Sequence, residues 1–250
     1  WIWGFGLSLM TLFTFAAWPA LAQDSDAMQS LVDSFPKELL AMFGLTDSAA
    51  LSTPEGFVSS RTYGSVGPIV VIVFAITAMA SLVAREESTG RLDMVLSNPL
   101  ERPNVLGEKA NAVFVLMGVI GIILFGVAAF GNAQWDTGMN VWYILSANVG
   151  LGLLGLCFWG IAVALWSMLG GSGSVGATAA VAVVAYFLNG LGASVDILEP
   201  FRVLSPFYWF LGDTVPLSKG LTWGYLALAF VSIGGTLFAM ARFRTRNLAV

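Results

Sequence analysis

Residues Ala84 to Lys109, with the sequence AREESTGRLDMVLSNPLERPNVLGEK, carry the densest charge in the chain and lie between two long apolar runs. A charged side chain costs roughly 2.5 to 3.5 kcal/mol at the centre of a membrane helix, so this segment must lie in water or against another protein. Leu92, Val95 and Leu96 recur at helical spacing until Pro99. The pattern predicts a short amphipathic helix, which either rests on lipid headgroups or docks on a partner.

The composition of the whole chain indicates a membrane protein. Of its 250 residues 57% are hydrophobic and 10% are charged, whereas soluble domains carry roughly 25% charged residues. The chain has no His and one Cys, Cys157, which excludes an internal disulfide and a Cys/His metal cluster. Its net charge of −4 argues against a nucleic-acid partner, which needs a basic face.

Six apolar runs are long enough to cross a bilayer, which takes about 20 residues in a helix. We therefore predict an all-α integral membrane protein with one transmembrane domain over residues 1–250. The segments 23–65 and 196–219 are predicted to be external and to contain interfacial helices, and residues 85–109 form a charged loop that we call the hinge. The predicted spans cover about residues 1–22, 66–84, 110–131, 141–168, 175–195 and 220–241.

The first run allows two interpretations. It ends in Ala20-Leu21-Ala22, which is similar to a signal-peptidase site, so a cleaved secretory signal is one possibility. The run begins without Met or a basic segment, and five further apolar runs follow. We favour a first span whose cytoplasmic lead-in precedes Trp1.

The basic residues predict the orientation, because cytoplasmic loops of membrane proteins carry an excess of Lys and Arg. Four cations lie in the other loops, namely Lys37, Arg61, Arg202 and Lys219. The hinge and the C-terminal segment together hold seven, namely Arg85, Arg91, Arg102, Lys109, Arg242, Arg244 and Arg246. We therefore expect the hinge and both termini in the cytoplasm.

The spans offer little chemistry of their own. The six predicted spans contain no Asp, Glu, Lys, Arg or His, the residues that build proton relays inside membranes. Sodium coupling through the carbonyls of broken helices stays possible. Residues 170–174, GGSGS, lack the Lys of a phosphate loop, and without His there is no Ser-His pair. The chain is expected to have no enzyme activity.

The hinge resembles the A-x-E-E-x-x-G-T/R-L-D signature of the permeases of type-2 ABC exporters, through Ala84 to Pro99 followed by Arg102 and Lys109. Phe35-Pro36-Lys37-Glu38, Tyr186-Phe187-Leu188-Asn189-Gly190 and Leu204-Ser205-Pro206-Phe207-Tyr208-Trp209 resemble the outer-loop and fifth-span signatures of the same family. Glu101 departs from the pattern, which has a small or hydroxyl residue there.

This resemblance implies a six-span permease in the cytoplasmic (inner) membrane, paired with a second copy or a sister half. Two cytoplasmic ABC ATPase subunits would carry ATP and Mg²⁺, and this chain would hold no cofactor or metal. The loop between spans two and three would be the coupling helix that docks on the ATPase. That role would fall to Glu86, Glu87, Gly90, Arg91, Leu92, Leu96 and Pro99, and spans two and five would line a substrate path with Phe74, Met79, Tyr186 and Asn189.

We accordingly expect an ATP-driven exporter of a hydrophobic or amphipathic compound such as a drug or antibiotic. Two other interpretations stay open: an ion-coupled carrier, and a membrane subunit that assembles or anchors another complex without transport. The sequence does not identify the cargo, and it does not distinguish a homodimer from a heterodimer.

Overall fold

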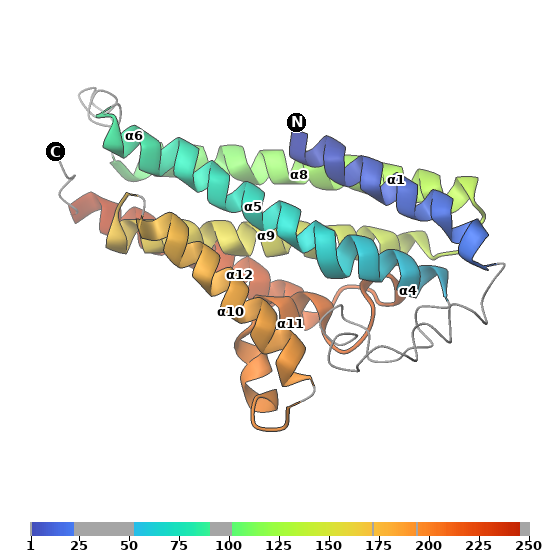
Figure 1. Ribbon diagram of the computed structural model, residues 1–250. Coiled ribbons are helices and arrows are strands. Elements are labelled where there is room, and N and C mark those ends of the chain that lie inside the picture. Colours follow the sequence, from blue (N-terminus) through green and yellow to red (C-terminus); the bar gives the residue numbers. More distant parts are fainter. Residues whose placement is uncertain (1, 23–52, 91–101, 172, 194, 246–250) are drawn as a thin grey trace.

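The computed structural model describes residues 2–22, 53–90, 102–171, 173–193 and 195–245. Within these ranges the chain is all-α, and six helices are long and apolar enough to cross a membrane (Figure 1). The prediction of a six-helix membrane fold is confirmed. The six are α1 (Ile2–Ala22), a continuous helix from Pro54 to Ser88, α8 (Arg102–Gln134), α9 (Val141–Leu169), α10 (Gly173–Gly192) and α12 (Trp223–Thr245).

The central helix of the bundle is α9. It packs against the helix 54–88 and against α8, α10 and α12, and Phe158, Trp159 and Trp166 on it are fully buried. Helix α1 lies along α8, where Gly4 meets Ile120 and Phe15 covers Gly131. In Figure 1 α10 and the short α11 (Pro206–Leu211) project away from the other helices.

The second membrane helix is longer than predicted. It joins α4 (Pro54–Val58), the π-helical stretch η2 (Ser59–Val66), α5 (Gly67–Met79), a second π-helical stretch η3 (Ala80–Ala84) and α6 (Arg85–Ser88). We expected residues 54–65 in an external loop and the span to begin at 66. The helix begins earlier because the Thr53 side chain accepts a hydrogen bond from the amide of Gly56 at 3.1 Å and Pro54 occupies the first turn.

The helices also continue into the hinge, which we predicted to be a loop over residues 85–109. Residues 85–88 complete the second helix, and α8 begins at Arg102 rather than at 110. The 33 residues of α8 measure about 50 Å, which exceeds the roughly 30 Å hydrocarbon core, so charged residues can extend the helix beyond the lipid. The predicted amphipathic helix of the hinge lies outside the described residues.

The other four spans each begin and end within four residues of the predicted positions. Short helices were expected in residues 196–219, and three are present: η4 (Glu199–Leu204), α11 and η5 (Pro216–Ser218). Ser205 connects α11 to α10, because its hydroxyl donates to the carbonyl of Ala185 at 2.7 Å and accepts from the amide of Phe207 at 3.2 Å. Most of the outer segment 23–65 lies outside the described residues.

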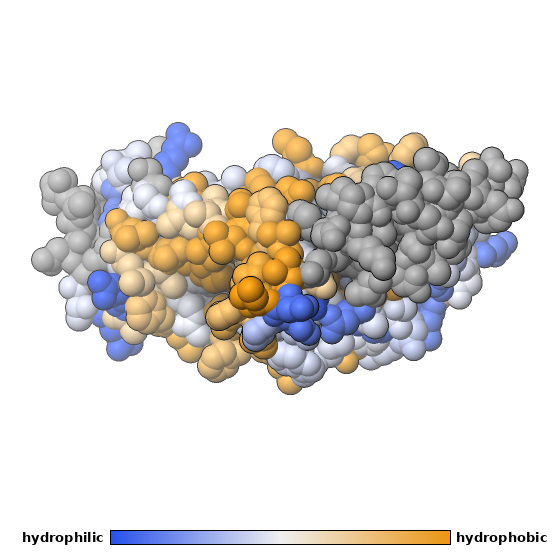
Figure 2. All heavy atoms as spheres, turned by 60° about the horizontal axis from the view of Figure 1, so that its bottom comes forward, coloured by the Kyte–Doolittle hydropathy of each residue, from blue (hydrophilic) through white to orange (hydrophobic). Residues whose placement is uncertain are grey.

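The described surface suits a lipid environment. Figure 2 shows apolar side chains gathered over the middle of one face, with hydrophilic residues around them. Val184 on α10 and Leu226 and Phe230 on α12 are at least 65% exposed. Soluble monomers rarely expose large apolar areas, and where they do, these areas contact other proteins or lipid.

Candidate functional site

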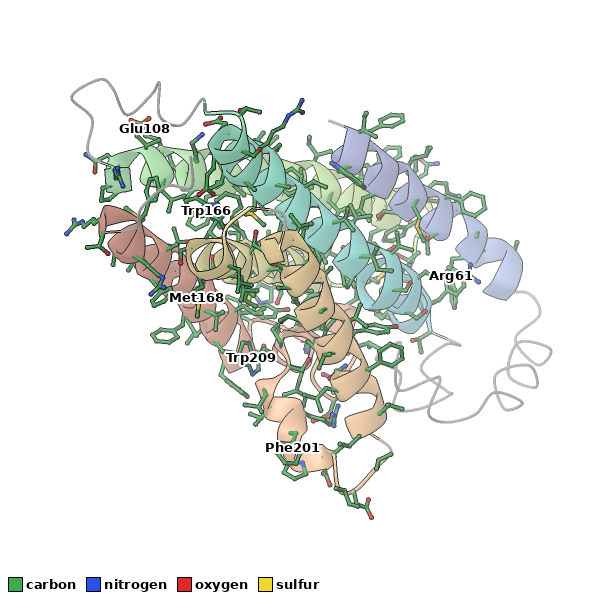
Figure 3. All side chains as sticks on the ribbon, turned by 60° about the vertical axis from the view of Figure 1, so that its left-hand side comes forward. Arg61, Glu108, Trp166, Met168, Phe201 and Trp209 are labelled. Carbon is green, nitrogen blue, oxygen red and sulfur yellow. The ribbon has the colours of Figure 1, made fainter. Side chains whose placement is uncertain are left out.

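The polar contacts of interest lie at the end of the bundle where α6 ends, α8 begins and α9 and α12 end; we call it the hinge end. The two adjacent carboxylates of the sequence motif, Glu86 and Glu87, both lie here. Figure 3 shows Glu108 on α8 and Trp166 on α9 toward this end of the bundle.

Glu86 connects α6 to α8. Its carboxylate Oε2 lies 2.6 Å from the ammonium Nζ of Lys109, and both side chains are partly exposed. Lys109 also donates to the main-chain carbonyl of Leu82 at 2.7 Å. The ion pair therefore joins the two ends of the hinge, which lie 23 residues apart in the sequence.

Glu87 points in a different direction from Glu86, as adjacent residues of a helix do. It is only 8% exposed, and its Oε2 accepts a hydrogen bond from the indole Nε1 of Trp166 at 2.7 Å. Because the bond involves a carboxylate, it belongs to the stronger class of protein hydrogen bonds. Glu87 thus faces the interior of the bundle and connects α6 to α9.

Trp166 in turn contacts α12. Its ring lies 5.3 Å from the ring of Phe243, at an interplanar angle of 55°. One residue along each helix, the guanidinium Nε of Arg242 donates to the carbonyl of Ser167 at 3.1 Å. The guanidinium of Arg102, in the first turn of α8, lies 6.0 Å from the centre of the Phe243 ring.

The other residues assigned to coupling lie at or beyond Gly90. Gly90 ends α6 with φ +68°, and its amide donates to the carbonyl of Glu87 at 3.1 Å. Positive φ is the left-handed conformation that glycine adopts at helix ends without steric cost. Arg91, Leu92, Leu96 and Pro99 lie outside the described residues.

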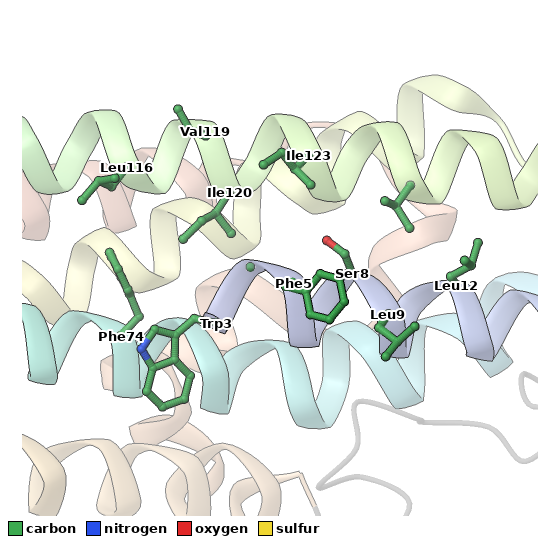
Figure 4. A pocket seen from close by; sticks show the side chains of 12 residues that line it. Trp3, Phe5, Ser8, Leu9, Leu12, Phe74, Leu116, Val119, Ile120 and Ile123 are labelled. Carbon is green, nitrogen blue, oxygen red and sulfur yellow. The ribbon is translucent and has the colours of Figure 1, made fainter. Parts of the chain in front are cut away.

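The structure gives each of the four residues proposed to line a substrate path its own set of contacts, and their role in a path stays a prediction. Phe74 lines an apolar groove of about 540 Å³ between α1, α5 and α8 (Figure 4). Met79 is buried, with its sulfur 3.8 Å from the hydroxyl of Ser174. Tyr186 packs edge-on against Phe207 at 5.3 Å. Asn189 is 3% exposed, and its Oδ1 has no hydrogen-bond partner among the described residues.

Sequence reasoning missed Trp166 and Phe243. Trp166 lies 79 residues from Glu87, within an apolar run where an aromatic residue carries no distinctive pattern. The only available signal was the position of both residues at the ends of spans predicted to reach the same side of the membrane.

At the opposite end, the surroundings of Lys219 alter its titration. Burial lowers the pKa of its ammonium from 10.5 to about 8, and the negative charge of Asp213 partly opposes that change. Its Nζ donates to the carbonyl of Leu211 beside Gly212. Asp213 itself pairs with Arg202 at 3.0 Å.

The chain matches the model of a known protein family. The family model described as "Multidrug efflux system permease Rv1217c, C-terminal domain" covers residues 2–244 of the chain. No curated protein and no solved structure matches the sequence.

Proposed function

Because the chain belongs to the multidrug efflux permease family represented by the C-terminal domain of Rv1217c, we propose that it is the membrane subunit of an ATP-driven exporter. The family match and the six apolar helices establish a multi-pass transport permease. The source of energy and the cargo are the proposed parts. We propose a hydrophobic or amphipathic cargo of the drug or antibiotic type.

The observation that carries the proposal is the contact network of the hinge end. The hinge is charged, while the predicted spans lack Asp, Glu, Lys, Arg and His, so the energy for transport is best supplied from outside the lipid. Glu86 and Glu87 connect the end of the second helix to α8 and α9. Force applied at the hinge would therefore reach several spans at once.

The partners follow from this arrangement. Two cytoplasmic ABC ATPase subunits would bind ATP and Mg²⁺ and dock on the hinge through residues 86–99. A second permease copy or a sister half would complete the transport path. The complex would lie in the cytoplasmic membrane with the hinge end facing the cytoplasm, as the distribution of Lys and Arg favours.

The test is purification of the tagged full-length chain from its native membranes in mild detergent, with mass spectrometry and an ATPase assay on the same fraction. We expect a nucleotide-binding subunit to copurify. Leu92→Gln, which removes an apolar hinge residue, should reduce its recovery. Leu204→Gln is the matched control, because Leu204 is 66% exposed in the outer segment.

Two results would overturn the proposal. One is recovery of the chain without any ATPase even after cross-linking. The other is export by reconstituted vesicles that follows an ion gradient and continues when ATP is depleted, which would favour an ion-coupled carrier.

A further inference from the structure

We infer that Trp166 is the positioning residue through which a displacement of the hinge reaches α9 and α12. The inference rests on the proposed function, because it assigns a route to the force that an ATPase would apply. It adds a residue that neither the sequence motif nor the family match identifies. Two contacts of the buried Trp166 indole and one hydrogen bond to the next residue, Ser167, support the inference.

The first contact fixes the indole to the hinge. Glu87 lies one residue before Ser88, the last residue of α6, and its carboxylate accepts a hydrogen bond from Trp166 Nε1 at 2.7 Å. Trp166 is fully buried and Glu87 nearly so. A buried carboxylate that loses such a partner suffers a large desolvation penalty, so displacement of Glu87 favours joint movement of the indole.

The second contact fixes the indole to α12, and the third fixes the adjoining backbone of α9 to α12. The Phe243 ring lies against Trp166, and the Arg242 guanidinium holds the carbonyl of the next residue, Ser167. Farther along the same two helices, a Cβ built on Gly160 would lie 2.6 Å from the carbonyl oxygen of Ser232. Because packed interiors transmit displacement rather than absorb it, α9 and α12 should move as one unit.

The contacts of the neighbouring Glu86 differ from those of Glu87, and this difference assigns the connection to α9 to Glu87 and Trp166. Glu86 pairs with Lys109 on α8 and is partly exposed, so it restrains the hinge without reaching α9. The two adjacent acids therefore have separate roles: Glu86 secures the hinge to α8, and Glu87 conveys its movement through Trp166.

The chain offers a matched control on the same helix. Trp159 is also fully buried on α9, but its indole Nε1 has no hydrogen-bond partner among the described residues. Trp166→Phe and Trp159→Phe therefore make the same chemical change. Each keeps an aromatic ring and removes one indole N–H, and only the first removes a bond to the hinge.

The experiment reconstitutes the full complex with its ATPase and measures transport of a fluorescent hydrophobic dye per ATP hydrolysed. We expect the ratio to fall in Trp166→Phe and to be unchanged in Trp159→Phe, with ATPase subunits recovered in both. Glu87→Ala should lower the ratio as Trp166→Phe does. Glu87→Gln, whose amide oxygen can still accept the indole N–H, should largely restore it.

The outcomes separate this inference from the proposed function. If the unmodified complex shows no ATP-driven transport, the proposed function fails. If it transports the dye and Trp166→Phe retains the normal ratio, the role of Trp166 is wrong. If Trp166→Phe does not assemble, the comparison of Glu87→Ala with Glu87→Gln decides: equal ratios in the two variants would overturn the inference.

Discussion

At the scale of single residues, Gly90 determines how the second helix ends. Its φ of +68° lies in the left-handed region, and a Cβ there would meet no atom of the described residues within 4 Å. A side chain at this position carries a conformational cost of about 1 to 2 kcal/mol. We expect Gly90→Ala to lower the free energy of local opening at the end of α6 by about 1 kcal/mol, measured by hydrogen exchange of the amides of residues 85–90.

Gly126 provides the control for this change. It lies within α8 with open space around it and no positive φ. Because Ala is the better helix former, Gly126→Ala should stabilise the protein by up to about 1 kcal/mol. If the α6 amides exchange equally slowly in the unmodified protein and in Gly90→Ala, the left-handed conformation of Gly90 does not determine the stability of the end of α6.

Lys219 should make stability depend on pH. Burial lowers its pKa to about 8 in the folded protein, against 10.5 for an ordinary lysine. Below pH 8 both states carry the proton and the cost of the buried charge is fully present. Between pH 8 and 10.5 the unfolded chain binds more protons, so stability rises with pH. The midpoint of thermal unfolding, followed by tryptophan fluorescence, should increase over this range.

The contribution of Lys219 can be isolated by Lys219→Met, which keeps the apolar stem and removes the titrating group. This variant should lose the rise in midpoint between pH 8 and 10.5. A rise of the same size in Lys219→Met would assign it to another group.

At the scale of elements, the crossing of α9 and α12 depends on two glycines. A Cβ on Gly235 would lie 2.5 Å from the carbonyl oxygen of Gly160, and a Cβ on Gly160 would meet the backbone of Ser232. Small residues let membrane helices approach this closely. Gly160→Ala should force the backbones apart and lower the free energy of unfolding by about 1 to 3 kcal/mol.

The measurement is a denaturation curve in detergent, with Gly152→Ala as the control. A Cβ on Gly152 would lie 3.9 Å from Met117 Cγ, an ordinary contact, so that variant on the same helix should be nearly neutral. Similar losses from both substitutions would show that the close crossing at Gly160 does not determine the effect, because helix propensity alone favours Ala at both positions.

The elements also show how far the sequence could predict the structure. Apolar run length was enough to find all six membrane helices, because a bilayer sets their minimum length. The early start of the second helix was missed, although Thr53-Pro54-Glu55 is a helix-start pattern. The charged ends of α6 and α8 were assigned to the hinge because hydropathy reports where lipid ends, and a helix can continue beyond that point.

The candidate site was less accessible to sequence reasoning. The motif identified Glu86 and Glu87, but their partners depend on how distant helices pack. Trp166 and Phe243 lie in apolar segments where position, rather than residue type, determines their role. The path residues Phe74, Tyr186 and Asn189 stay a prediction, because a single chain's sequence does not fix the rotation of each helix.

At the scale of the whole molecule, the two ends differ in charge and in contacts. The hinge end gathers the Glu86, Glu87 and Arg242 contacts, while the opposite end has short helices and the Arg202 and Asp213 pair. This polarity fits the proposed exporter, in which an ATPase would act at the hinge end. It makes the orientation in the membrane the most consequential proposal to test.

Single cysteines can determine that orientation. Cys157 is the chain's one cysteine and is fully buried, so Cys157→Ser provides a background without reactive thiols. Ser88 at the hinge end and Thr214 at the opposite end are both small, polar and exposed. In intact cells a membrane-impermeant maleimide should label Thr214→Cys, and it should label Ser88→Cys only after permeabilisation. The reverse pattern would place the hinge outside the cell, away from ATP, and would contradict both the orientation and the proposed docking of an ATPase.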